Sequence, residues 1–368
     1  MPVTNTFTPH EQLQIDAIES VLSARDLGQD PAPIVVEVHP TDLCNHRCSY
    51  CFHGGVGNDA TRRNEMLSVD QYSDLFDEAE EMGVQEISVS GGGEPFLYKG
   101  IDRLLSNLGS RTMRTRLITH GNQIPEEVDQ YLLDIDELRF SIDTTNQQEY
   151  NRIRGLHEDN PAVSKTLANM RRIVDVRESA TDPRLQINAT AILGRINSNP
   201  ESVQKTANYL LGSLGIDRLV YKQDIYGIIK PDDSQIAELQ EVLNSLTNIY
   251  GDALVIRTNE ELTRITGNPC IVPYFKIALN PYGEVFSCCL ASQPDDPNGE
   301  LFGSLEANNG SFRSLWESSK HSRDKLLEGV KCTDCNHTDR TINARIMGLR
   351  GEIIQTTQVF IKDKSKRD

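Results

Sequence analysis

Residues 34–51 read IVVEVHPTDLCNHRCSYC, in which a short apolar run precedes three closely spaced cysteines, Cys44, Cys48 and Cys51. The β-branched run predicts a buried strand, and the cysteines follow on the loop after it. Three thiolates within eight residues can bind three corners of an iron–sulfur cluster and leave its fourth iron open to an exogenous ligand. The alternative is a zinc site, which needs a fourth ligand such as His46 or His53.

Strand and helix signals alternate from this stretch onward. Further apolar or β-branched runs occur at 86–89, 115–119, 137–142, 185–192 and 217–221. Helical periodicity is clear at 68–82, which opens with a Ser68–Gln71 capping box and ends at Gly83. Asn199–Pro200 predicts the start of another helix. Six strand–helix units predict an α/β fold, a partial (β/α)6 TIM-type barrel, with its chemistry at the carboxyl ends of the strands.

The pattern changes after about residue 255. Residues 275–289 predict a β-hairpin that turns at Asn280–Gly283, and 311–328 predicts a helix. A second group of cysteines occurs in this part of the chain: Cys270, Cys288, Cys289, Cys332 and Cys335. We therefore expect an N-terminal extension, a barrel, a small cysteine-rich domain of hairpin plus helix, and a tail, with bounds 1–33, 34–254, 255–340 and 341–368.

Composition narrows the class of protein. The chain has 368 residues and a formal charge of −17, which disfavours binding to a nucleic-acid backbone. We see neither a secretory signal nor an apolar stretch long enough to span a membrane, so we expect a cytoplasmic protein with no membrane partner. Eight cysteines in that compartment are more typical of metal sites than of disulfides.

The first cysteine group resembles a known family signature. The spacing C-x3-C-x2-C, with Tyr50 before the last cysteine, is similar to the motif of the radical S-adenosylmethionine (SAM) superfamily. The resemblance implies a [4Fe–4S] cluster on Cys44, Cys48 and Cys51 whose open iron binds SAM. It also implies reductive cleavage of SAM to a 5′-deoxyadenosyl radical, chemistry that belongs to the cofactors while the protein positions them.

Further residues resemble SAM-binding positions of that family, across roughly 30–225. Glycines at the end of the second strand allow close approach of the backbone, and Glu94 can accept hydrogen bonds from an ammonium. Thr119–Asn122 departs from a common T-N-G loop by carrying His120. Arg154 resembles the arginine that meets the SAM carboxylate, its alternative being a solvated helix residue. The expected SAM contacts are Gly91, Gly92, Gly93, Glu94, Ser141, Asp143, Arg154, Asn188 and Leu193.

The second cysteine group resembles the start of a SPASM motif. Cys270, then Gly283-x4-Cys288, then Cys332-x2-Cys335 provide four ligands, and Thr341 stands where a longer motif needs another cysteine. The resemblance implies the shortened twitch form with one auxiliary [4Fe–4S] cluster, similar to aminocyclitol dehydrogenases and peptide maturases. A four-cysteine zinc site is the alternative. Cys289 is expected to be a buried spectator, a substitute ligand for Cys288, or a hydrogen donor to a substrate radical.

These features together favour a radical SAM oxidoreductase. A fully ligated auxiliary cluster would accept an electron from the substrate, and a donor such as flavodoxin or ferredoxin would supply the reducing electron. Only 33 residues precede the first predicted strand, which favours a small polar substrate over a peptide. The alternatives are a redox-neutral epimerase and a non-catalytic iron–sulfur or zinc protein. Candidate substrate contacts are His53, Lys222, Gln223 and Asp224.

Overall fold

The computed structural model describes residues 7–51, 53, 65–224, 228–257, 269–291, 300–329, 335 and 337–349. Its strands form one sheet in the order β10-β9-β8-β1-β2-β3-β4-β5-β6-β7. Neighbours from β8 through β1 to β7 pair in parallel, whereas β8–β9 and β9–β10 are antiparallel. The strands are β1 (Val35–Val38), β2 (Glu86–Val89), β3 (Arg114–Thr119), β4 (Glu137–Ser141), β5 (Gln186–Leu193), β6 (Arg218–Gln223), β7 (Leu254–Arg257), β8 (Lys276–Leu279), β9 (Glu284–Phe286) and β10 (Leu301–Ser304).

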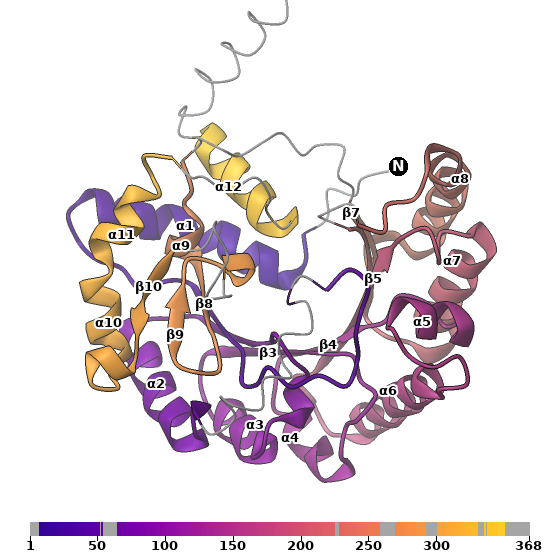
Figure 1. The fold of residues 1–368 in the computed structure, drawn as a ribbon, viewed down its shortest axis with the longest axis horizontal. Helices are drawn as coiled ribbons and strands as arrows, with labels where there is room; N and C mark the ends of the chain where they lie inside the picture. Colours follow the sequence, from indigo (N-terminus) through magenta and orange to yellow (C-terminus); the bar gives the residue numbers. More distant parts are fainter. Residues whose placement is uncertain are drawn as a thin grey trace, which may run out of the picture.

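Helices cover the outer face of the curved sheet, and the carboxyl ends of the strands open on one side (Figure 1). The predicted partial TIM-type barrel is therefore confirmed. The α-helices are α1 (Pro9–Asp26), α2 (Val69–Met82), α3 (Ile101–Gly109), α4 (Asp129–Leu132), α5 (Gln147–Ile153), α6 (Ala162–Ser179), α7 (Pro200–Ala207), α8 (Asp233–Tyr250), α9 (Val272–Phe275), α10 (Phe312–Ser318), α11 (Lys320–Lys325) and α12 (His337–Leu349). A π-helical segment, Asn208–Leu214, extends α7.

Local sequence signals explain where several helices begin and end. Ser68 and Gln71 form the predicted capping box of α2, and Gly83 ends that helix with a φ of 93°, a conformation that glycine adopts without a Cβ clash. The Asn199 side chain accepts hydrogen bonds from the first turn of α7, and Pro200 occupies its first position. These predictions are confirmed.

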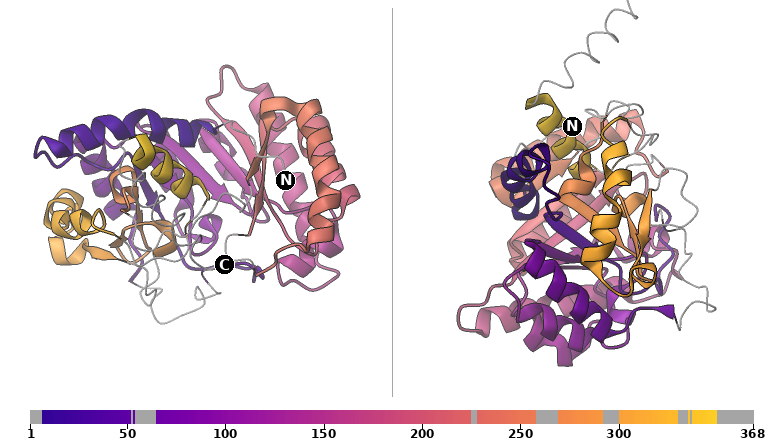
Figure 2. Two further views of the ribbon diagram at one scale, coloured as in Figure 1. Left: turned by 90° about the horizontal axis from the view of Figure 1, so that it is seen from above. Right: turned by 90° about the vertical axis from the view of Figure 1, so that its left-hand side faces the viewer.

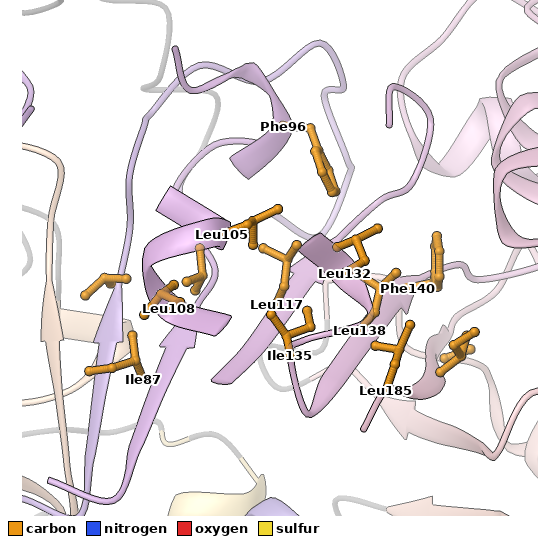
Figure 3. Close-up of a cluster of buried hydrophobic side chains, with 14 of the residues drawn as sticks. Ile87, Phe96, Leu105, Leu108, Leu117, Leu132, Ile135, Leu138, Phe140 and Leu185 are labelled. Carbon is orange, nitrogen blue, oxygen red and sulfur yellow. The ribbon is translucent and has the colours of Figure 1, made fainter. Parts of the chain in front are cut away.

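The main core lies between the sheet and the outer helices. In β2 every residue is buried, as expected for a parallel strand with both faces covered. Figure 3 shows Leu105 and Leu108 of α3 gathered with Ile87, Leu117 and Leu138 of the strands. This apolar layer fixes the strands from the outside, so their inward-facing residues are held in place around the site.

The C-terminal part differs from the sequence-based expectation in how it joins the barrel. The hairpin turns at Asn280–Gly283 as predicted, but β8 pairs in parallel with β1, and β7 adds a seventh strand to the barrel. Periodicity did not indicate this because β8 is a four-residue, fully buried strand that follows only the short helix α9. The predicted helix at 311–328 is two helices, α10 and α11, that meet at Ser319.

The ends of the described chain meet on one side of the molecule. Helix α12 packs beside α1, and Ile342 and Ile346 share a second apolar cluster with Ile18 and Leu22 (Figure 2). Helix α12 crosses residue 340. The domain limits that the sequence suggests at 255 and 340 stay predictions. Among the described residues, no helix combines the length and apolarity needed to cross a bilayer.

Candidate functional site

A cavity of about 390 Å³ opens on the inner face of the barrel. The structure brings most of the predicted site residues to its wall. These are Cys44, Cys48, Cys51, Gly91, Gly92, Gly93, Glu94, Ser141, Asp143 and Arg154. They come from the loops after β1, β2 and β4 and from the end of α5, so residues up to 110 positions apart (44 to 154) share one site.

The cysteine loop is fixed by backbone hydrogen bonds to the end of α5. The amides of Arg47 and Ser49 donate to the carbonyls of Arg154 and Ile153, each at 2.9 Å. Within the loop, the amide of Cys51 donates to the carbonyl of Cys48. The three thiols are consequently held on one side of the cavity. Burial raises the pKa of the Cys44 thiol to about 11, which disfavours the thiolate in the absence of a metal. A bound metal would reverse this preference, because its positive charge stabilises the thiolate.

Arg154 and Asp143 form a buried ion pair beside this loop. Their Nη2 and Oδ2 atoms lie 2.8 Å apart, and both side chains are almost fully buried. The Tyr50 hydroxyl donates to Asp143 at 2.8 Å, and Arg154 donates to the Ser141 carbonyl at 2.7 Å and to the Cys48 thiol at 3.3 Å. The alternative of a solvated helix arginine is therefore wrong. The pair joins the cysteine loop, β4 and α5 in one network.

Breaking this pair should destabilise the protein. An Arg154→Met variant removes the ion-pair partner of the buried Asp143 side chain, so we expect the free energy of unfolding to fall by about 3–5 kcal/mol. Urea denaturation of the reconstituted, SAM-free protein measures this change. Exposed Arg152 gives the matched control, Arg152→Met, which should change stability by less than about 0.5 kcal/mol. Equal losses in both variants would contradict the assignment.

The glycine loop packs tightly against the start of the cysteine loop. A Cβ atom on Gly93 would lie 2.3 Å from the Leu43 carbonyl oxygen, whereas on Gly92 it would meet only side-chain atoms, the nearest at 2.9 Å. The amides of Gly93 and Glu94 donate to the carbonyls of Thr41 and Leu43. Gly93 is thus required for close approach of the two backbones.

Glu94 is buried behind the glycine loop and accepts three hydrogen bonds. The Thr119 hydroxyl donates at 2.6 Å, and the amides of His120 and Phe96 donate at 2.9 and 3.3 Å. Burial outweighs these bonds and raises the pKa of the Glu94 carboxyl to about 7. An ammonium in the cavity would favour its charged form, because an opposite charge lowers a carboxyl pKa.

His120 explains the departure from the T-N-G loop. Its ring stacks on His46 with 3.9 Å between ring centroids and hydrogen-bonds through Nε2 to the Asn45 side chain, so it supports the cysteine loop directly. Burial lowers the pKa of His46 to about 2. Both His46 ring nitrogens are buried without a hydrogen-bond partner among the described residues.

The residues of the cysteine loop fit an iron–sulfur cluster. They supply soft thiol donors, a buried setting and polar atoms left unsatisfied nearby. In the part of the chain that the structure describes, no three His, Cys, Asp or Glu side chains are gathered closely enough to hold a single metal ion as they stand.

The sequence matches a known family over this same region. The profile of the Radical SAM superfamily matches residues 38–210, which include the cysteine loop, the glycine loop and the Asp143–Arg154 pair. Residues 38–210 form a radical SAM domain. The protein accordingly contains a radical SAM domain, and that family implies one [4Fe–4S] cluster and SAM as cofactors.

Individual relatives extend the likeness beyond this domain. The chain is 23% identical to "Mycofactocin maturase MftC" of Mycolicibacterium smegmatis over 325 residues, 84% of this chain and 76% of the relative. It is 25% identical to a "GTP 3′,8-cyclase" of Stenotrophomonas maltophilia over 175 residues. That match covers 47% of this chain and 49% of the cyclase, so the chain spans about half of the cyclase's length.

Solved structures share the fold. Streptococcus suis SuiB bound to S-adenosylmethionine superposes with a TM-score of 0.61 at 17% identity, covering 91% of this chain and 80% of that chain. Native anSMEcpe with bound AdoMet gives a TM-score of 0.57 at 13% identity, covering 89% of this chain and 100% of that chain. At these identities the likeness concerns the fold alone.

The two predicted contacts on β5 take different places in the radical SAM domain. Asn188 is buried and has the same strand parity as Thr190 and Ile192, which line the cavity. Leu193 has the opposite parity and lies in the apolar core behind the sheet, so its side chain is not with the other site residues. The backbone amide of Ile192 donates to Asp143 at 3.0 Å, which ties β5 to the ion pair.

The C-terminal cysteines separate into two groups. Cys270 and Cys288 pack against the second apolar cluster, and the pKa of the Cys335 thiol, raised by burial, is raised further by nearby Asp339, Cys288 and Cys270. The Cys335 thiol therefore lies near Cys270 and Cys288, and the three fit an auxiliary cluster by donor type. Cys289 instead lines the barrel cavity. Cys332 lies outside the described residues.

Two cavity residues were missed by the sequence analysis. Lys276 Nζ lies 2.7 Å from Asp339 of α12 and 3.9 Å from both Glu37 and the Cys289 thiol. Glu37 in turn accepts a hydrogen bond from the Ser90 hydroxyl at 2.6 Å. The available signal was a single charged residue in each of two otherwise apolar strands, β1 and β8.

The candidate substrate contacts are mostly on the cavity wall. His53, Lys222 and Asp224 line the cavity, whereas Gln223 is buried and does not. The alternation along β6 explains this difference, since residues 222 and 224 point to one face and residue 223 to the other. His53 also packs edge-on against His39, with 5.6 Å between the ring centroids.

Proposed function

We propose that this radical SAM enzyme is an oxidoreductase that removes hydrogen from a substrate carbon and carries an auxiliary [4Fe–4S] cluster. Cys44, Cys48 and Cys51 would hold the first cluster, and Cys270, Cys288, Cys332 and Cys335 the second. Bound SAM and the first cluster, when reduced, supply a 5′-deoxyadenosyl radical in the cavity. The single observation that carries the proposal is that the Cys335 thiol lies near Cys270, Cys288 and Lys276, and Lys276 lies at the cavity wall.

The chain's own residues would bind and orient the SAM. Glu94 offers a buried carboxylate to the SAM ammonium, and Gly91, Gly92 and Gly93 line the cavity beside it. One carboxylate oxygen of Asp143 accepts hydrogen bonds from Tyr50 and Arg154. Because Asp143 follows β4, its carboxylate would be placed to accept a hydrogen bond from a sugar hydroxyl of SAM. Arg154 would move part of its pairing from Asp143 to the SAM carboxylate. Enclosure within the barrel keeps water from a reactive carbon radical.

Oxidation is favoured over other outcomes by the four cysteines of the second group. Four protein ligands leave no open iron, so this cluster would accept the electron that remains after hydrogen removal. Flavodoxin or ferredoxin would supply the electron that starts the reaction. The substrate would be a peptide or a small polar molecule. Support for a peptide comes from two similar proteins, a maturase and SuiB, which has been solved bound to "precursor peptide SuiA".

Reductive SAM cleavage tests the core of this proposal. The anaerobically reconstituted protein, treated with dithionite and SAM without substrate, should release 5′-deoxyadenosine, because the residues proposed to bind SAM line one cavity. Liquid chromatography with mass spectrometry measures the product. Absence of 5′-deoxyadenosine in a preparation with about eight irons per chain would contradict the proposal. The protein would then be a non-catalytic metal protein.

Cys289 favours a second candidate function, redox-neutral epimerisation. Its thiol lines the cavity, and burial raises its pKa well above the ordinary value, so the sulfur keeps its hydrogen. A substrate radical could take that hydrogen atom, which forms a C–H bond and leaves a sulfur radical. That radical would need one electron and one proton from the external reductant before the next turnover. Deuterium from solvent in the product would support this reaction over oxidation.

A further inference from the structure

Lys222 is a cation inside the cavity without a counter-ion. It lies near the end of β6, opposite Ile192 of β5 and Arg257 of β7, and its side chain lines the cavity. Among the residues that the structure describes, Lys222 has no hydrogen bond or ion pair. Lys222 is half-buried at the cavity wall, and an enclosed ammonium is costly unless it is paired, so the cavity favours an anion beside it.

The surroundings of Lys222 are positively charged overall. Arg116 and Arg139 share one carboxylate, Glu137, at 3.5 and 2.6 Å, and Arg257 pairs with Glu11 at 3.0 Å. Among the described residues, three arginines and one carboxylate, Glu11, act on the Lys222 ammonium, so the balance of charge around it is positive. Burial, and next the nearby charge of Arg139, lowers the pKa of Lys222 to about 8.

Other charged groups at the cavity wall are already engaged. Arg154 pairs with Asp143, and Lys276 pairs with Asp339. His10 and Glu86 lie 2.5 Å apart, and Asp224 accepts a hydrogen bond from the amide of Ile229 at 3.0 Å. Among the described residues, Lys222 is therefore the cavity-lining Lys or Arg for which no ion pair is found.

We propose that Lys222, with Arg139 and Arg116, binds an anionic group of the substrate, a carboxylate or a phosphate. The inference rests on the proposed function, because it places the substrate in the same cavity as SAM. The arginines supply planar donors suited to carboxylate and phosphate oxygens, and Lys222 supplies the charge that is not yet compensated. A neutral substrate would leave Lys222 unpaired, so the site selects against uncharged analogues.

Anion binding to the SAM-loaded, reconstituted enzyme tests the inference. Isothermal titration with acetate and with inorganic phosphate should detect binding by the wild-type enzyme, and the tighter anion identifies the group. Lys222→Met keeps the apolar stem and should weaken binding by about tenfold or more, whereas Lys222→Arg should stay within about threefold of wild type. Lys230, an exposed lysine, provides the matched control, Lys230→Met, which should bind as the wild type does.

Three results would overturn the inference. Equal anion affinity in wild type and Lys222→Met would remove Lys222 from the site, and the folded Lys222→Arg variant guards against a loss caused by misfolding. Weaker SAM binding by Lys222→Met would assign the lysine to SAM instead. Release of 5′-deoxyadenosine by the wild-type enzyme is measured in parallel. Its absence rejects the proposed function, whereas its presence without anion binding rejects only the anion site.

Discussion

Replacing Cys44, Cys48 and Cys51 together by alanine should lower the iron content from about eight to about four atoms per chain. It should also abolish release of 5′-deoxyadenosine, because the remaining cluster would have four protein ligands and no open iron for SAM. The expected loss is complete for SAM cleavage and one half for iron and acid-labile sulfide. Colorimetric iron and sulfide analysis of anaerobically reconstituted protein measures the stoichiometry independently of activity.

The same iron and sulfide analysis distinguishes the alternative metal assignments of the two cysteine groups. About four irons in the wild type and almost none in the triple variant would mean that the C-terminal cysteines hold zinc or no metal. Redox-neutral chemistry would then become the leading reaction. Equal iron in both proteins would contradict the assignment of the cysteine loop. Zinc analysis of the same samples completes the comparison.

The barrel and the centre of the site could be predicted because their signals are local in sequence. Three cysteines within one loop, and Ser141 with Asp143 at the end of one strand, reach the cavity through the geometry of a single βα connection. Strand runs and helix caps are local for the same reason, as the confirmed start of α2 at Ser68 shows.

The features that could not be predicted depend on contacts between distant segments. Arg154 is buried because the cysteine loop and β4 enclose it, and a helix pattern alone cannot indicate that. The pairing of β8 with β1 joins segments about 240 residues apart. The charge excess around Lys222 arises only when β3, β4, β6 and β7 are brought together, so no window of sequence contains it.

The adjacent cysteines of the hairpin illustrate the same limit on a smaller scale. Sequence spacing left open whether Cys288 or Cys289 is the ligand, because both follow Gly283 at nearly the required distance. In the fold they face different surroundings. Cys288 packs with Cys270 in the second apolar cluster and influences the Cys335 thiol, whereas Cys289 lines the barrel cavity near Lys276.

Cys288→Ala should therefore lose about four irons per chain, and Cys289→Ala should keep about eight. The two substitutions remove the same atom from neighbouring residues, so each is the matched control for the other. Iron and sulfide analysis after anaerobic reconstitution measures both. Iron loss in Cys289→Ala with full iron in Cys288→Ala would exchange their roles and contradict the cavity assignment.

The same pair of variants also distinguishes the two candidate reactions. If Cys289 returns hydrogen to a substrate radical, Cys289→Ala keeps both clusters yet incorporates no deuterium from solvent into product. If the enzyme oxidises its substrate, Cys289→Ala should still form the oxidised product, whereas Cys288→Ala should cleave SAM without forming it, because the electron acceptor is lost. A retained cluster with retained oxidation in Cys289→Ala would leave this thiol as part of the cavity wall, where its hydrogen takes no part in turnover.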